Sequence, residues 1–157
     1  MKVEAWFIGK TTDAYLKEGI DKYCKKLPHY IPFEQLIIPD IKKAGKLPVS
    51  QLKQREAAVV LKKLKPQDGL ILLDEKGKQM SSEALAVWVD YQLQMPYKRL
   101  LFLVGGAYGF DESLYQRANG KLSLSPMTFS HQMVRLFLVE QLYRAMTILR
   151  NEPYHNS

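Results

Sequence analysis

Two loops of small residues follow apolar segments in the second half of this sequence. The run Leu100–Val104 leads into Gly105–Gly109, and the shorter run Leu122–Leu124 leads into Ser125–Phe129. Because glycine lacks a Cβ atom, the first loop lets the backbone approach a ligand closely or take a positive φ. For the pair Gly105-Gly106 alone, a plain tight turn is the competing interpretation.

A third apolar run, Gly69–Leu73, ends in the same way. Open α/β sheets bind ligands at the carboxyl ends of their parallel strands. If the three strand ends adjoin, they form one cleft with apolar walls and backbone hydrogen-bonding groups. The sequence puts no lysine where it would hold phosphates, so we expect a purine and a ribose here rather than a polyphosphate.

Other binding motifs are absent from the sequence. Gly9-Lys10-Thr11 resembles the end of a phosphate-binding loop, but Glu4 stands where the first glycine of that motif must be. Gly105–Gly109 lacks the spacing of the dinucleotide fingerprint and follows the fourth expected strand rather than the first. We expect no metal, because the single cysteine and the histidines lack metal-ligand spacing; they are Cys24, His29, His131 and His155.

Strand-like and helix-like segments alternate along the chain, which has no repeat or linker. This order predicts a single α/β domain over residues 1–157, with a mostly parallel sheet and helices on both faces. We expect a basic loop over 41–49 and a turn over 74–79. Ser50 is the expected cap of one helix, and Ser81 or Ser82 of the next. The expected strands are 2–8, 33–38, 69–73, 100–104 and 122–124, and the expected helices are 13–27, 50–64, 82–95, 111–118 and 130–150.

The last expected helix is apolar around most of its circumference. Only Glu140, Gln141, Arg144 and Thr147 form a narrow polar stripe. A helix of this kind must be buried on nearly all sides. One sheet in so small a domain does not provide that cover, so we expect a second copy of the chain. The alternative is a helix buried centrally within a monomer.

The composition indicates a soluble protein with a basic surface. The chain has 157 residues, a net charge of +7 and a pI of about 9.4. Such a pI makes nucleic acid a candidate partner, although lysines on solvated faces give the same value. No apolar run approaches the length of a membrane span, and the amino terminus lacks a signal-peptide pattern. With one cysteine, these features predict the reducing cytoplasm.

Four strings of residues resemble one family across essentially the whole chain. They are Val104–Gly109, Leu122–Arg135, Val139–Ala145 and Pro153–His155. Together they are similar to the RlmH family, which comprises SPOUT-superfamily methyltransferases of the large ribosomal subunit. The resemblance implies S-adenosylmethionine as the methyl donor and N3 of a pseudouridine in large-subunit (23S) rRNA, on assembled ribosomes, as the target. It also implies a C-terminal trefoil knot and a homodimer whose active site is completed across the interface.

The family pattern also implies roles for individual residues. The tail residues Tyr154 and His155 are expected beside the target base. The family often has a basic residue after this histidine, whereas Asn156 and Ser157 follow here. The residues implied in donor binding are Leu73, Gly105, Leu124, Ser125, Pro126, Met127, Thr128 and Phe129.

The implied reaction requires a group that removes the proton from N3 of the target base. The ring N3 lies between two carbonyls and must lose its proton before or during attack on the methyl group. His155 has a pKa near neutrality and is the candidate base, while Arg135 or Arg144 is the candidate for stabilising the anionic ring. A frayed terminal residue is the alternative for His155. For His131 we favour local hydrogen bonding at the start of its helix.

Three other functions remain open from the sequence. A non-catalytic ribosome-assembly factor would share the fold, and a SPOUT enzyme acting on tRNA would share the charge and the dimer. A nucleotide-binding α/β protein is disfavoured, because the sequence has no phosphate-binding loop.

Overall fold

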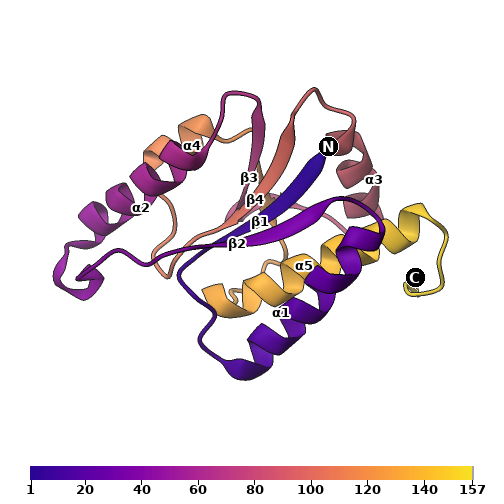
Figure 1. Ribbon diagram of the computed structural model, residues 1–157, viewed down its shortest axis with the longest axis horizontal. Coiled ribbons are helices and arrows are strands. Elements are labelled where there is room, and N and C mark those ends of the chain that lie inside the picture. Colours follow the sequence, from indigo (N-terminus) through magenta and orange to yellow (C-terminus); the bar gives the residue numbers. More distant parts are fainter. Residues whose placement is uncertain (157) are drawn as a thin grey trace.

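The computed structural model describes residues 1–156. Within them, five strands form one sheet in the order β2-β1-β4-β3-β5, and every neighbouring pair is parallel (Figure 1). The predicted α/β class and parallel sheet are therefore confirmed. The strands are β1 Lys2–Ile8, β2 Phe33–Ile38, β3 Asp68–Gln79, β4 Arg99–Val104 and β5 Gly120–Ser123.

Helices cover both faces of this sheet, as predicted. One face carries α1, α3 and α5, and the other carries α2 and α4 (Figure 1). Among residues 1–156, no helix is both long enough and apolar enough to cross a membrane. The helices are α1 Ala14–Lys26, α2 Val49–Lys63, α3 Ser82–Leu93, α4 Glu112–Arg117 and α5 His131–Leu149, with short 3₁₀ turns at Leu27–His29 and Ala44–Lys46.

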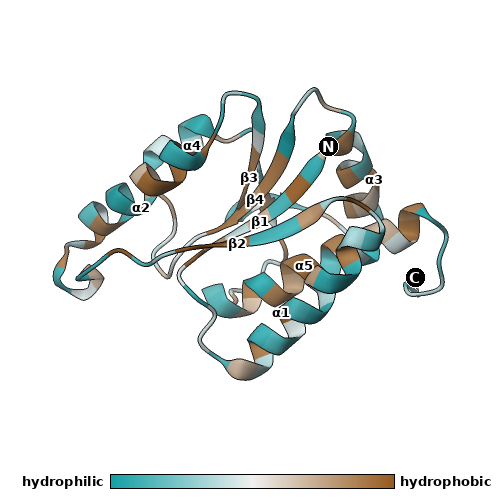
Figure 2. Ribbon diagram, in the orientation of Figure 1, coloured by the Kyte–Doolittle hydropathy of each residue, from teal (hydrophilic) through white to brown (hydrophobic). Residues whose placement is uncertain are grey.

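The central strand β4 contributes side chains to the hydrophobic cores on both faces of the sheet. Leu100, Phe102 and Val104 pack in the core beneath α1, α3 and α5, whereas Leu101 and Leu103 pack beneath α2 and α4. A strand covered on both sides needs apolar residues at every position, which is why its sequence is an unbroken apolar run. Figure 2 shows the contrast with α1, which presents mostly hydrophilic residues outward.

Two sequence-based boundaries were wrong. The expected turn over 74–79 is a continuation of β3, which pairs again with β5 at Lys78 and Gln79 after an irregularity. Gly77 permits this, because a Cβ atom there would lie 2.6 Å from the carbonyl carbon of Leu122. In addition, α2 begins after Pro48 rather than at a Ser50 cap. The proline fixes φ at a value that suits the residue before a helix.

The α3 cap is Ser81, one of the two predicted residues, and its Oγ accepts a hydrogen bond from the Ala84 N–H at 3.1 Å. The cap satisfies one of the free N–H groups in the first turn. The helix therefore begins at Ser82 and ends at Leu93.

Helix α5 packs between α1 and α3 against the sheet (Figure 1). Every residue from His131 to Leu149 is buried or half-buried within the single chain. The polar stripe in the structure is narrower than the predicted one. Thr147 does not belong to it, because its side chain is fully buried and donates a hydrogen bond to the Arg144 carbonyl at 2.7 Å. Central burial within one chain thus accounts for much of the apolar character of α5, and the second copy stays a prediction.

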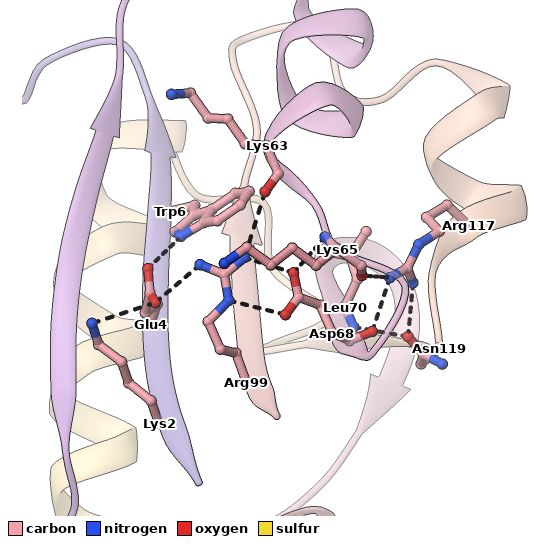
Figure 3. A network of polar contacts seen from close by, with 10 residues as sticks. All are labelled: Lys2, Glu4, Trp6, Lys63, Lys65, Asp68, Leu70, Arg99, Arg117 and Asn119. Carbon is pink, nitrogen blue, oxygen red and sulfur yellow. Dashed lines mark hydrogen bonds and ion pairs between the residues drawn. The ribbon is translucent and has the colours of Figure 1, made fainter. Parts of the chain in front are cut away.

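A polar network ties the amino ends of three strands together (Figure 3). Arg99 at the start of β4 donates to both carboxylate oxygens of Asp68 at the start of β3, at 2.9 and 2.6 Å. It also donates to Glu4 of β1 at 3.3 Å. The Asp68 carbonyl accepts a further bond from Arg117 at 2.9 Å. These groups lie at the edge of the sheet opposite the carboxyl strand ends.

Candidate active site

The carboxyl ends of β4 and β5 adjoin the middle of β3, at Leu73–Lys76, and together they line one cleft. The three strands are neighbours in the sheet, and the cleft between their following loops has a volume of about 760 Å³. This volume lies within the usual range for small-molecule sites. Of the residues expected to hold a donor, only Pro126 does not line it; those that do are Leu73, Gly105, Leu124, Ser125, Met127, Thr128 and Phe129.

The glycine loop after β4 is shaped by its neighbours. Neither Gly105 nor Gly106 has a positive φ; in this loop that conformation belongs to Gly109, at +82°. A Cβ atom on Gly105 would lie 2.8 Å from the Phe110 ring, and one on Gly106 would lie 3.1 Å from Glu56. Close packing against the Phe110 ring therefore requires glycine at position 105, whereas the flexible end of Glu56 leaves room at Gly106, and backbone handedness requires neither glycine.

The loop after β5 is held by its own hydroxyl groups. Ser123 Oγ donates to the Ser125 carbonyl at 3.0 Å, and Ser125 Oγ accepts from the Met127 N–H at 2.9 Å. Phe129 anchors the other end, because its ring packs 4.9 Å from the Phe137 ring of α5. Met127 remains 74% exposed. The loop thus presents fixed backbone groups with one exposed apolar side chain at its tip.

The cleft also contains residues that the sequence did not assign to it, including His131, for which local hydrogen bonding at the start of its helix was favoured. Asp74 follows Leu73 directly, Tyr115 comes from α4, and His131 and Val134 come from the first turn of α5. Burial, followed by the neighbouring Asp74, raises the pKa of Tyr115 to about 12. Burial also lowers the pKa of His131. Asp74 was detectable in the sequence as an acidic residue at the end of an apolar run, but it fell in the segment expected to turn.

Arg135 lies outside the cleft and is fully buried. Its guanidinium donates to the carbonyls of Ile8 and Gly9, both at 2.7 Å, and to Thr11 Oγ1 at 3.2 Å. Burial lowers its pKa to about 10, so it is still charged at neutral pH. These contacts join α5 to the end of β1 and give Arg135 a structural position outside the cleft.

The tail residues form a separate cluster at the far end of α5. Arg144 donates to His155 Nδ1 at 3.0 Å, and His155 Nε2 contacts Glu83 at 2.8 Å. Tyr154 donates to Glu140 at 3.1 Å and also contacts the Tyr23 hydroxyl. The sequence-predicted residues Tyr154, His155 and Arg144 are therefore brought together.

The geometry fixes the protonation of the His155 ring. Because a guanidinium only donates, Nδ1 must be the acceptor and Nε2 carries the proton toward Glu83. This hydrogen bond lowers the pKa of Glu83. Burial raises the pKa of Tyr154, and its bonds to Tyr23 and Glu140 act in the same direction. The phenol is therefore a hydrogen-bond donor at neutral pH.

The cluster lies outside the cleft of its own chain, since Arg144, Tyr154 and His155 are not among the residues that line it. His131, at the start of α5, borders the cleft, whereas Arg144 lies thirteen residues further along the same helix. At 1.5 Å per residue this separation is about 20 Å. Within one chain, the predicted donor residues and the predicted tail residues do not meet.

Known proteins resemble this chain over almost its full length. A family model described as "Predicted SPOUT methyltransferase" matches residues 1–155. "Ribosomal RNA large subunit methyltransferase H" of Cytophaga hutchinsonii is 52% identical over 156 residues, which cover 99% of this chain and 100% of the relative. Proteins with the same name from Parabacteroides distasonis and Flavobacterium johnsoniae are each 51% identical over 156 residues, with 99% of both chains covered. This chain therefore belongs to the SPOUT methyltransferase family, and its resemblance to the RlmH group is confirmed.

Proposed function

We propose that this protein transfers a methyl group from S-adenosylmethionine to N3 of a pseudouridine in large-subunit (23S) ribosomal RNA. The relatives at 43–52% identity are named for large-subunit rRNA methylation. The observation that carries the proposal is the cleft, which three neighbouring strands and the loops after β4 and β5 form. We further propose that the protein acts on ribosomes in the cytoplasm as a homodimer, and that its carboxyl-terminal region forms the trefoil knot implied by the family.

The cleft residues suit such a donor. Apolar side chains of Leu73, Leu124 and Val134 are suited to an adenine ring, and the loop backbones offer hydrogen-bonding groups. The buried Oδ2 atom of Asp74 has no hydrogen-bond partner among residues 1–156 and is free to accept one from a ligand. A carboxylate also favours a donor that carries positive charge.

The donor supplies a methyl group that is already activated. The protein must therefore position this methyl group against the attacking nitrogen and stabilise the negative charge that develops on the ring. Holding the methyl group in line with the attacking nitrogen contributes up to about 7–11 kcal/mol. Removal of the N3 proton places negative charge on the ring between its carbonyls. His155 and Arg144 together offer N–H groups that stabilise such charge. For His155 to act as the base, its Nδ1 must first separate from Arg144.

The position of the tail supports the dimer. A tail whose residues do not line the cleft of their own chain is suited to reaching the cleft of a second copy, which makes each active site composite. The half-buried apolar residues Met133, Leu136 and Phe137 on α5 are candidates for the contact. The basic surface would then be shared by two chains, and binding to RNA should weaken steeply with salt.

The test is methyl transfer to ribosomes that lack the modification. We expect the purified protein and S-adenosylmethionine to add one methyl group to large-subunit rRNA, mapped by mass spectrometry of nuclease fragments. Bulk tRNA is the parallel substrate, because methylation of tRNA instead would favour a related SPOUT enzyme. Donor binding without transfer to either RNA would favour the non-catalytic assembly factor.

A further inference from the structure

The Asp74 carboxylate is unusual among the residues of the cleft. Within residues 1–156, three buried side-chain atoms lack a hydrogen-bond partner, and only Asp74 Oδ2 belongs to a residue that lines the cleft. Its other oxygen, Oδ1, accepts a long hydrogen bond of 3.4 Å from the Lys76 N–H. The side chain is half-buried, with Oδ2 shielded from solvent.

A shielded carboxylate oxygen without a partner lowers the stability of a protein. Asp74 comes directly after Leu73, at the end of the apolar part of β3, where the irregular pairing with β5 begins. A potential donor to it in the cleft is the Tyr115 hydroxyl, whose pKa the interaction with Asp74 helps to raise, although Oδ2 has no partner at hydrogen-bond distance. The sheet does not need a carboxylate at this place, because its strand pairing uses backbone groups.

We infer that Asp74 Oδ2 accepts a hydrogen bond from the methyl donor and so determines which donor molecules bind. An ionised carboxylate only accepts hydrogen bonds, so it selects a ligand with O–H or N–H groups at that point. S-adenosylmethionine offers such groups in its nucleoside part and in the ammonium of its amino-acid part. The inference rests on the proposed function, since it names a further residue for the same donor.

The Asp74→Asn variant separates this role from a structural one. Asparagine keeps the size of the side chain but removes its charge, so the free protein loses the cost of shielding a carboxylate. The free variant should unfold at the same temperature as the wild type or at a higher one. Donor affinity should fall about tenfold, because a hydrogen bond to a charged carboxylate is replaced at best by a weaker one to a neutral amide oxygen. If the role of Asp74 were structural, the free Asp74→Asn variant would instead unfold at a lower temperature than the wild type.

The experiment is calorimetric titration of three proteins with two probes. The proteins are the wild type, Asp74→Asn and the control Asp90→Asn, which makes the same charge change at an exposed position of α3 outside the cleft. The probes are S-adenosylhomocysteine and 5′-methylthioadenosine, which lacks the amino-acid part. Thermal unfolding of each free protein is measured alongside, and Asp74→Ala repeats the test should the Asn variant fail to fold.

Each outcome is decisive. Weaker binding of both probes by Asp74→Asn supports contact with the nucleoside part, and weaker binding of S-adenosylhomocysteine alone supports contact with the ammonium. Equal affinity for wild type and Asp74→Asn, or a destabilised free variant with unchanged affinity per folded molecule, overturns the inference while the proposed function stands. If the wild type binds neither probe, the proposed donor itself is wrong.

Discussion

At the scale of single residues, Arg135 shows how a charged side chain on an apolar helix can be misread. From sequence it was a candidate for stabilising the target base. In the fold it is fully buried and donates to the Ile8 and Gly9 carbonyls, where the chain leaves β1. Ile8 ends β1 and Gly9 follows it, and their carbonyls need a donor because buried backbone groups are costly when unpaired.

We expect Arg135→Met to destabilise the protein by about 3 kcal/mol, because it leaves two buried carbonyls without a donor. Urea unfolding should show a lower midpoint, while the affinity of the folded protein for S-adenosylhomocysteine should change little. Arg150→Met is the matched control on an exposed arginine just after α5, with an expected effect below about 0.5 kcal/mol. A variant as stable as the wild type but poor in methylation would return Arg135 to a role in the reaction.

At the scale of elements, the strand β3 serves two ends of the sheet. Its amino end takes part in the network of Asp68 and Arg99, and its middle supplies Leu73 and Asp74 to the cleft. Burial of Asp68 alone would raise its pKa. The hydrogen bonds from Arg99 and from the Lys65 N–H outweigh burial, so the pKa of Asp68 lies below its ordinary value near 3.8.

This shift predicts the acid sensitivity of the sheet. A carboxyl group with a lowered folded pKa contributes stability above its ordinary pKa and loses it as the pH falls through the folded value. We expect Asp68→Asn to cost about 2 kcal/mol at neutral pH and to flatten the loss of stability below about pH 4. Urea unfolding at a series of pH values measures both effects.

The control for this measurement is Glu34→Gln, whose carboxylate pairs with Lys2 on the surface and is 65% exposed. An exposed pair contributes little, so this variant should keep both the neutral stability and the acid slope of the wild type. An acid slope that Asp68→Asn leaves unchanged would mean that other carboxyl groups cause the acid sensitivity.

At the scale of the whole molecule, the separation between cleft and tail predicts how copies of the chain combine. We expect light scattering to give twice the chain mass of 18.1 kDa. We also expect His155→Ala to slow methylation with little change in donor affinity, and Leu124→Glu to block the cleft. Each variant damages a different half of a composite site.

Co-expression of these two variants with different affinity tags tests the arrangement. If the tail of one copy serves the cleft of the other, a mixed dimer has one intact site, and a random mixture regains about a quarter of the wild-type activity. Co-expression of each variant with itself is the control and should regain none. A mixture that stays inactive would place tail and cleft in the same chain, and a single-chain mass would exclude the dimer.

The sequence by itself determined the class of fold and the position of the cleft. Apolar runs such as Leu100–Val104 specify strands covered on both faces, and their alternation with amphipathic segments specifies a parallel sheet. Since parallel strands share one carboxyl edge, loops at Gly105–Gly109 and Ser125–Phe129 had to follow strand ends on the same side. Local patterns were sufficient because they reflect burial and periodicity.

Only the tertiary structure decided what individual polar residues do. The continuation of β3 through residues 74–79 depends on contact between Gly77 and Leu122, which lie far apart in the sequence. Arg135 and Arg144 occupy the same helix, yet one is buried against β1 and the other meets His155. The partners of a side chain are set by long-range packing, which residue type and spacing do not encode.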